Sequence, residues 1–176
     1  MKWLMREKAL WLAGIFIFLG LATDWFGFSG VTWEEEVRLH DGSILVVERF
    51  VKRGGGHEIG QKPGYINQTL RFVLPGTTNI ITWEDHFDSA LDRSNFLPFA
   101  LDIYRGTPYL VAYPMGCLGY KKWGRPNPPY VVFRYERDVW WRIRLADLPA
   151  EIINSNLVFS QPDVEAERLG KRKISE

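Results

Sequence analysis

The chain has 176 residues, of which 46% are hydrophobic and 15% aromatic. This composition excludes a disordered chain and predicts one packed domain, because each buried aromatic ring removes roughly 150–250 Å² from water. The net charge is +1, and residues 31–176 carry 19 basic and 19 acidic side chains. A neutral domain has no overall field to attract phosphates, so nucleic acid is not an expected partner.

The N-terminus has the pattern of a membrane-directed segment. Lys2, Arg6 and Lys8 precede 14 uncharged residues, 9–22. A helix of that length reaches ~21 Å, short of the ~30 Å hydrocarbon core, which is typical of a signal peptide cleaved here after Ala22. Continuing the helix through residue 28 makes it long enough to remain as a membrane anchor. In both alternatives the positive-inside rule sends the rest of the chain across the membrane. A cytoplasmic protein with a buried N-terminal helix is the third alternative.

The rest of the chain alternates apolar and polar residues in the manner of β-strands. Trp33, Glu35, Val37 and Leu39 share one face of the first predicted strand. Four hairpins are expected, each around a turn rich in Gly, Pro or Asp. Their paired segments are 33–39 with 44–51, 69–74 with 79–83, 97–104 with 109–113, and 130–135 with 139–145. We therefore expect a mainly β fold, an antiparallel sandwich, barrel or meander of about eight strands, preceded by one hydrophobic helix, transmembrane or signal.

The segments between and after these strands complete the organisation. The Gly-rich stretch 53–64 predicts a loop, and residues 115–129 are expected to be irregular. Residues 148–153 suit the start of a short helix. The polar residues 161–176 lack apolar periodicity and are expected to form a flexible tail. The predicted division is a membrane segment (1–28), a β-rich domain (29–160) and the tail (161–176).

One polar cluster suits acid–base catalysis. Glu84, Asp85 and Asp88 surround His86 in the sequence, so a carboxylate could orient its imidazole as a general base. The alternative is a polar strand end without catalytic function. The three histidines lie in separate predicted turns and the Gly-rich loop lacks P-loop spacing, so neither a metal nor a cofactor is expected. Cys117 is the single cysteine and is expected to be a buried thiol.

Residues 120–130 are the most unusual in composition. They combine aromatic, basic and proline residues, as interaction surfaces do. The alternative is a stiff crossover whose aromatic side chains cover the core. For the binding hypothesis, the candidate contact residues are Trp123, Arg125, Tyr130, Trp140, Arg142 and Arg144.

Several stretches resemble a group of uncharacterised bacterial envelope proteins. These stretches are 33–37 with Asp41-Gly42, 106–111, 123–130 and Leu148-Pro149. The resemblance runs over most of the chain and implies a short protein with an N-terminal export or membrane segment. It implies placement in the inner membrane or the periplasm, and it carries no catalytic residues.

From the sequence we expect a membrane-anchored or exported protein whose domain faces the periplasm and binds or assembles without catalysis. The expected location is the bacterial inner membrane, crossed once, or the periplasm after cleavage following Ala22. The expected partners are the membrane, through the N-terminal helix, and an envelope protein. The alternative function is a small envelope hydrolase that uses His86 with its neighbouring carboxylates.

Overall fold

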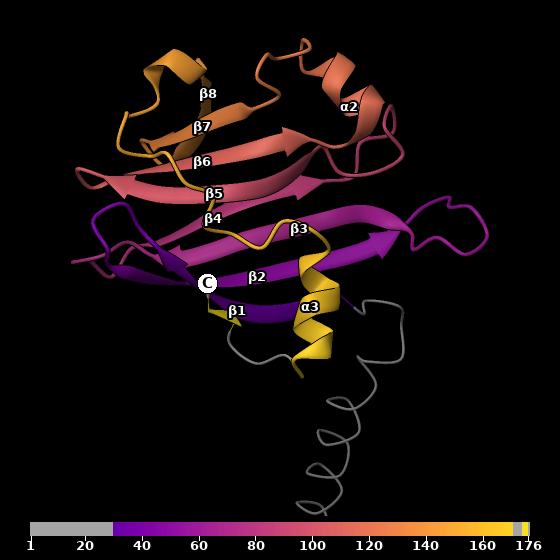
Figure 1. The fold of residues 1–176 in the computed structure, drawn as a ribbon, viewed down its shortest axis with the longest axis horizontal. Helices are drawn as coiled ribbons and strands as arrows, with labels where there is room; N and C mark the ends of the chain where they lie inside the picture. The colour runs from indigo at the N-terminus through magenta and orange to yellow at the C-terminus, as the bar shows by residue number, and fades with distance from the viewer. Residues whose placement is uncertain (1–29, 171–173, 176) are drawn as a thin grey trace, which may run out of the picture.

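The computed structural model describes residues 30–170 and 174–175 of the chain. The predicted N-terminal helix lies outside these residues. Within the described part, no helix has the length and apolar character needed to cross a bilayer. The described chain is mainly β, with eight antiparallel strands in two sheets and one short additional strand (Figure 1).

The first sheet is an antiparallel meander. Its strands are β1 (Val31–Arg38), β2 (Ile44–Gly54), β3 (Gly64–Val73) and β4 (Ile80–His86), and β9 (Ile174–Ser175) lies parallel to β1 at the edge. The predicted Asp-Gly turn joins β1 to β2, with Gly42 at φ +84°, a conformation that glycine adopts without strain. The predicted alternation in β1 is confirmed, because Trp33, Glu35 and Val37 are all buried.

The second sheet is also a meander. Its strands are β5 (Phe96–Tyr104), β6 (Thr107–Pro114), β7 (Val131–Glu136) and β8 (Val139–Ile143). Two-residue turns close both of its outer hairpins, Arg105-Gly106 and Arg137-Asp138, and all four residues have positive φ. Such turns match the right-handed twist of the strands they connect. All four predicted hairpins are therefore present, although these two turns are tighter than the sequence suggested.

The two sheets share one core and form a β-sandwich. Figure 1 shows them as an indigo-to-magenta layer and a pink-to-orange layer. Trp83 of the first sheet lies 6.3 Å from Phe96 and 6.2 Å from Phe133 of the second, measured between ring centroids. The same cluster includes apolar side chains that are almost fully buried on both sheets, namely Val37, Val47, Leu70, Leu101, Leu110 and Val131.

The segment that follows β8 joins the edges of the two sheets. After a 3-10 turn, η2 (Leu145–Asp147), the chain reaches Asn156, whose amide lies between β1 and β5. Its Nδ2 donates to the carbonyl oxygens of Leu101 at 2.8 Å and Arg38 at 2.9 Å, and its Oδ1 accepts from the Leu101 N–H at 2.9 Å. One side chain thus hydrogen-bonds backbone groups of both sheets.

Residues 162–168 differ from the expected flexible tail. They form helix α3 (Pro162–Arg168), in which Asp163 and Ala166 are buried. Arg53 donates two hydrogen bonds to Asp163, at 2.6 and 2.9 Å, and the Tyr65 hydroxyl donates a third at 2.8 Å. Burial alone would raise the pKa of Asp163, but these hydrogen bonds lower it. The sequence did not reveal this helix, because its attachment to the sheet depends on partners distant in the chain. These are the Arg53–Asp163 ion pair and the apolar cluster around Trp33 in which Ala166 is buried.

Three further local expectations are wrong. The stretch 115–129 contains helix α2 (Gly116–Lys122). Residues 148–153 do not continue as a helix; the only helical turn of the described chain near them is η2. Cys117 is exposed on α2 and is not a buried thiol.

Candidate functional site

The outer face of the second sheet carries a continuous apolar row. Ala100, Val111, Val132 and Ile143 are neighbours in register across the four strands. The first three are buried, although they point away from the shared core. What covers them is a layer of half-buried side chains that includes Phe99, Tyr130 and Leu148.

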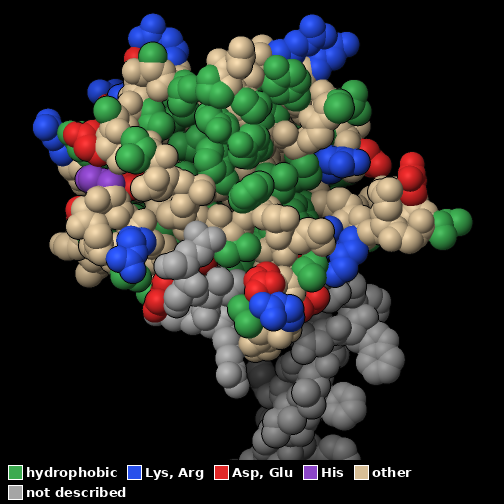
Figure 2. All heavy atoms as spheres, in the orientation of Figure 1, with side chains coloured by type: hydrophobic (Ala, Val, Ile, Leu, Met, Phe, Trp, Pro, Cys, Tyr) green, Lys and Arg blue, Asp and Glu red, His purple; other side chains and the backbone are tan. Residues whose placement is uncertain are grey.

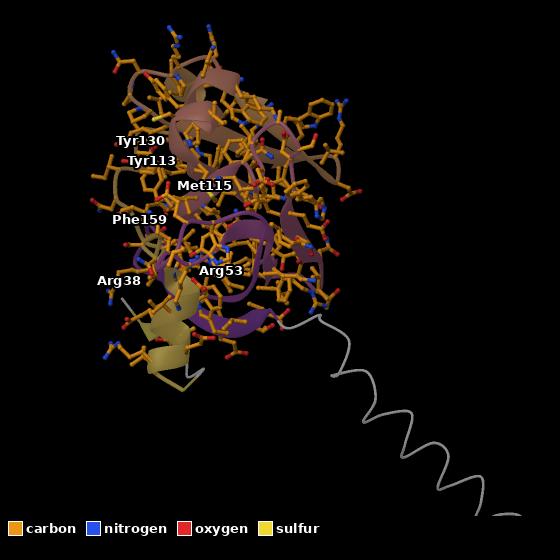
Figure 3. The ribbon with its side chains drawn as sticks, turned by 90° about the vertical axis from the view of Figure 1, so that its right-hand side faces the viewer. Arg38, Arg53, Tyr113, Met115, Tyr130 and Phe159 are labelled. Atoms are coloured by element: carbon orange, nitrogen blue, oxygen red, sulfur yellow. The ribbon has the colours of Figure 1, made fainter. Side chains whose placement is uncertain are left out.

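Four aromatic rings gather on this face. Phe99 lies 4.8 Å from Tyr113 and 5.1 Å from Tyr130, and Phe159 lies 6.0 Å from Tyr113 in a nearly stacked arrangement. Phe159 is 44% exposed. Figure 2 shows hydrophobic side chains massed over the half of the molecule that holds the second sheet, and Figure 3 shows Tyr113, Tyr130 and Phe159 along one side. We call these four rings the outer aromatic face.

The two sheets differ in charge. Residues 96–160 contain eight Arg or Lys and five Asp or Glu, whereas residues 30–95 contain seven and ten. Figure 2 shows basic side chains at both upper corners of the hydrophobic surface. The domain is formally neutral as a whole, but residues 96–160 are net basic and residues 30–95 are net acidic. The basic half is the one that carries the outer aromatic face.

The structure disperses the six contact residues proposed from the sequence. The Trp123 ring packs against Phe96 at 4.6 Å, and its Nε1 donates to Asn95 Oδ1 at 3.2 Å. Trp140 Nε1 donates to the carbonyl oxygen of Thr82 in the first sheet at 2.9 Å. Both tryptophans are partly buried against the core. Their geometry favours the structural alternative, in which the aromatic side chains of this region close the core.

The four other residues lie in four separate places. Arg142 stacks over Trp123 at 5.5 Å and donates to its carbonyl oxygen at 3.1 Å. Arg144 is exposed and pairs with Asp147. Arg125 is exposed in the turn after α2. Among the six, Tyr130 alone belongs to the outer aromatic face.

The His86 cluster is divided by the alternation of β4. Glu84 and His86 lie side by side on the exposed face, with Oε2 and Nε2 3.1 Å apart. Asp85 points to the opposite face, where it is buried and accepts hydrogen bonds from the N–H groups of Asn95 and Phe96. Burial raises the pKa of Asp85, although these hydrogen bonds oppose the shift. Asp88 is paired with Lys122. The four groups therefore do not converge.

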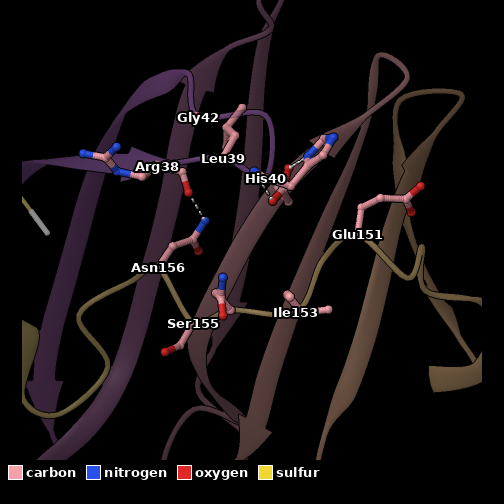
Figure 4. A pocket seen from close by; sticks show the side chains of 10 residues that line it. Arg38, Leu39, His40, Gly42, Glu151, Ile153, Ser155 and Asn156 are labelled. Atoms are coloured by element: carbon pink, nitrogen blue, oxygen red, sulfur yellow. Dashed lines mark hydrogen bonds and ion pairs between the residues drawn. The ribbon is translucent and has the colours of Figure 1, made fainter.

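A different histidine lies beside a buried carboxylate. Asp102 is 4% exposed and accepts hydrogen bonds from the backbone N–H of His40 at 2.9 Å and its Nδ1 at 2.6 Å. The pair lies in a cavity of about 340 Å³ that Glu151 and Ser155 also line (Figure 4). Figure 4 shows Ser155 pointing away from His40, so the pair has no aligned nucleophile there. The signal in the sequence was Asp102, a lone charge within an apolar strand.

The His40–Asp102 hydrogen bond should make stability depend on pH. It raises the pKa of His40 above its ordinary value, and the charges of Asp41 and Glu151 add to the shift. A raised folded-state pKa stabilises the fold fully below the unfolded pKa, ~6.5, and this contribution disappears as pH rises through the folded value. The stability advantage of the native chain over His40→Gln should therefore shrink as pH rises above ~6.5, measured by urea unfolding. An advantage independent of pH would contradict this.

In the described residues, no group of three or more His, Cys, Asp or Glu side chains is arranged to hold a metal ion. Comparisons with protein-family models, with curated proteins and with solved structures found no match.

Proposed function

We propose that the chain is a membrane-anchored or exported protein whose β-sandwich faces the periplasm and binds an envelope protein without catalysis. The observation that carries this proposal is the outer aromatic face. The anchored form would cross the inner membrane once, and the exported form would be released by cleavage after Ala22.

The outer aromatic face has the chemistry of a protein-binding surface. Tyr and Phe rings supply large, rigid contact areas with few rotatable bonds, and tyrosine hydroxyls add polar contacts at their edge. The hydroxyls of Tyr113 and Tyr130 lie 3.5 Å apart, so both can reach one polar group of a partner. Contiguous apolar surface of this kind is uncommon on monomers and marks interaction sites. The basic residues of the same half favour an acidic partner surface.

The hydrolase alternative has weaker support. General-base catalysis needs an oriented imidazole close to a concave substrate site. The His86 side chain is 64% exposed, and Asp85 and Asp88 are engaged in bonds that hold the start of β5 and α2. Glu84 alone remains beside the ring. The binding proposal therefore accounts for more of the described residues.

Site-specific photo-crosslinking in cells that make the protein tests the binding proposal. A photoreactive residue at position 159 should yield a discrete adduct with another protein, and one at position 153 should not. Ile153 is a matched control, because it is 78% exposed but lies in the cavity of His40. Adding Tyr113→Ser and Tyr130→Ser should lower the adduct yield roughly tenfold, since hot-spot truncations cost upwards of ~1.4 kcal/mol. Equal yields at 153 and 159, or none at 159, would overturn the proposal.

A further inference from the structure

The meander topology gathers four chain segments at one end of the sandwich. The chain enters at Val31, which pairs with Val51 near the end of β2. Because strands alternate in direction, the connections after β2, β4 and β6 must return to the end where β1 begins. These connections are residues 55–63, 87–95 and 115–130. Two contacts confirm their proximity, Lys122 with Asp88 and Ser94 N–H with the carbonyl oxygen of Tyr65. We call this the entry end.

Each of the three connections exposes one large apolar side chain. Ile59, Phe87 and Leu118 have exposed fractions of 106%, 49% and 62%. Figure 2 shows one such hydrophobic group at the tip of the loop between β2 and β3, which Figure 1 places at the far right. A fully exposed isoleucine at the tip of a glycine-rich loop adds nothing to the core. Its apolar surface is therefore free to contact an apolar surface outside the domain.

Basic side chains outnumber acidic ones in the connections that carry these apolar tips. The three connections carry five Arg or Lys and three Asp or Glu, whereas the turns at the opposite end, 39–43, 74–79, 105–106 and 137–138, carry two of each. A hollow of about 790 Å³ beside the first connection is lined by Arg53, His57, Lys62 and Arg93, among others. Arg53 is paired with Asp163. Lys62 and Arg93 make no ion pair with any other described residue, so their charges are available to an anion.

The chain itself brings this end close to the membrane. Only Ser29 and Gly30 separate the predicted segment 9–28 from Val31. Extended chain spans at most ~3.6 Å per residue, so the entry end would lie within about 10 Å of the last residue of an uncleaved anchor. Exposed apolar side chains on loops with an excess of basic residues are typical of proteins that contact anionic bilayers.

We infer that the entry end rests on the bilayer, with Ile59, Phe87 and Leu118 in the interfacial layer and the basic side chains of these connections on anionic lipid headgroups. This inference rests on the membrane attachment in the proposed function. It leaves the outer aromatic face, on the side of the sandwich, open to a protein partner.

Cys117 provides a native probe of this geometry, because it is the only cysteine and lies exposed beside Leu118. The full chain, labelled there with a fluorophore, is added to vesicles of phosphatidylcholine and phosphatidylglycerol that contain headgroup spin-labelled lipid. The control label is placed at the opposite end with Thr78→Cys in a Cys117→Ser background, since Thr78 is exposed in the turn after β3. We expect strong quenching at position 117 and little at position 78.

Three variants and one change of lipid composition sharpen the experiment. Ile59→Asp or Lys62→Glu should lower quenching at position 117 by about half or more. The first variant replaces an apolar tip by a negative charge, and the second replaces a positive charge by a negative one at the anionic interface. The matched variant Ile153→Asp should leave the quenching at position 117 unchanged. Vesicles of phosphatidylcholine alone should also give weaker quenching at position 117.

Flotation of the same samples separates the two proposals. A chain that does not float with the vesicles would contradict membrane attachment, and this inference with it. A chain that floats but is quenched equally at 117 and 78 would overturn the inference and leave the attachment standing. Quenching at 117 that is unaffected by Ile59→Asp, Lys62→Glu and the loss of phosphatidylglycerol would also overturn it. That last result would assign the basic residues to a partner other than lipid.

Discussion

Replacing Arg49 by Leu is expected to lower the free energy of unfolding by about 3–5 kcal/mol, because it leaves a buried carboxylate without its charge partner. Glu35 is fully buried and Arg49 is 2% exposed. Arg49 Nη1 donates to Glu35 Oε2 at 2.8 Å and to the carbonyl oxygen of Val158 at 2.7 Å. Glu35 Oε1 accepts from the Val158 N–H at 2.6 Å. The two charged side chains thus hydrogen-bond both backbone groups of Val158, which lies in the C-terminal segment.

The double variant Glu35→Leu, Arg49→Leu separates charge burial from packing. It removes both charges, so most of the loss should be recovered. Recovery should stay incomplete, because the N–H and C=O of Val158 lose their partners. Urea unfolding of the native chain, Arg49→Leu and the double variant measures these values. If the free energy of unfolding of Arg49→Leu lies within ~1 kcal/mol of that of the native chain, the buried ion pair described above is contradicted.

The second large effect is expected at Trp83, between the two sheets. Trp83→Ala should destabilise the fold by about 3–5 kcal/mol, because it empties a large volume between Phe96 and Phe133. Trp141→Ala is the matched control. Trp141 is 55% exposed on the second sheet, and its loss should cost about 0.5 kcal/mol. Thermal unfolding of both variants checks the difference, and equal losses would contradict the shared core.

The strand pattern was predictable because it is local. Alternation in residues 33–39 and the Asp41-Gly42 turn define a hairpin from neighbouring residues alone. Helix α3 and the placement of Asn156 depend on partners about 110 and 55 residues away in sequence, Arg53 and Leu101. A single sequence carries no local signal for such pairings.

The candidate site was only partly predictable for a related reason. Tyr130 was identified from the composition of its loop, but Phe99 and Tyr113 lie in strands whose outward-facing side could not be assigned before the register was known. Phe159 joins them from residues 154–160, for which the sequence pattern predicted no element. In the opposite direction, Trp123 has the composition of an interface anchor yet packs on Phe96.

Both proposals depend on one claim, that the sandwich lies on the far side of the membrane from the first residues of the chain. Labelling of Thr78→Cys, in the Cys117→Ser background, tests this most directly. Thr78 is exposed in a turn at the end of the sandwich opposite the chain entry. A membrane-impermeant maleimide applied to spheroplasts should label this cysteine as fully before lysis as after it. Labelling that appears only after lysis would place the domain in the cytoplasm and contradict both proposals.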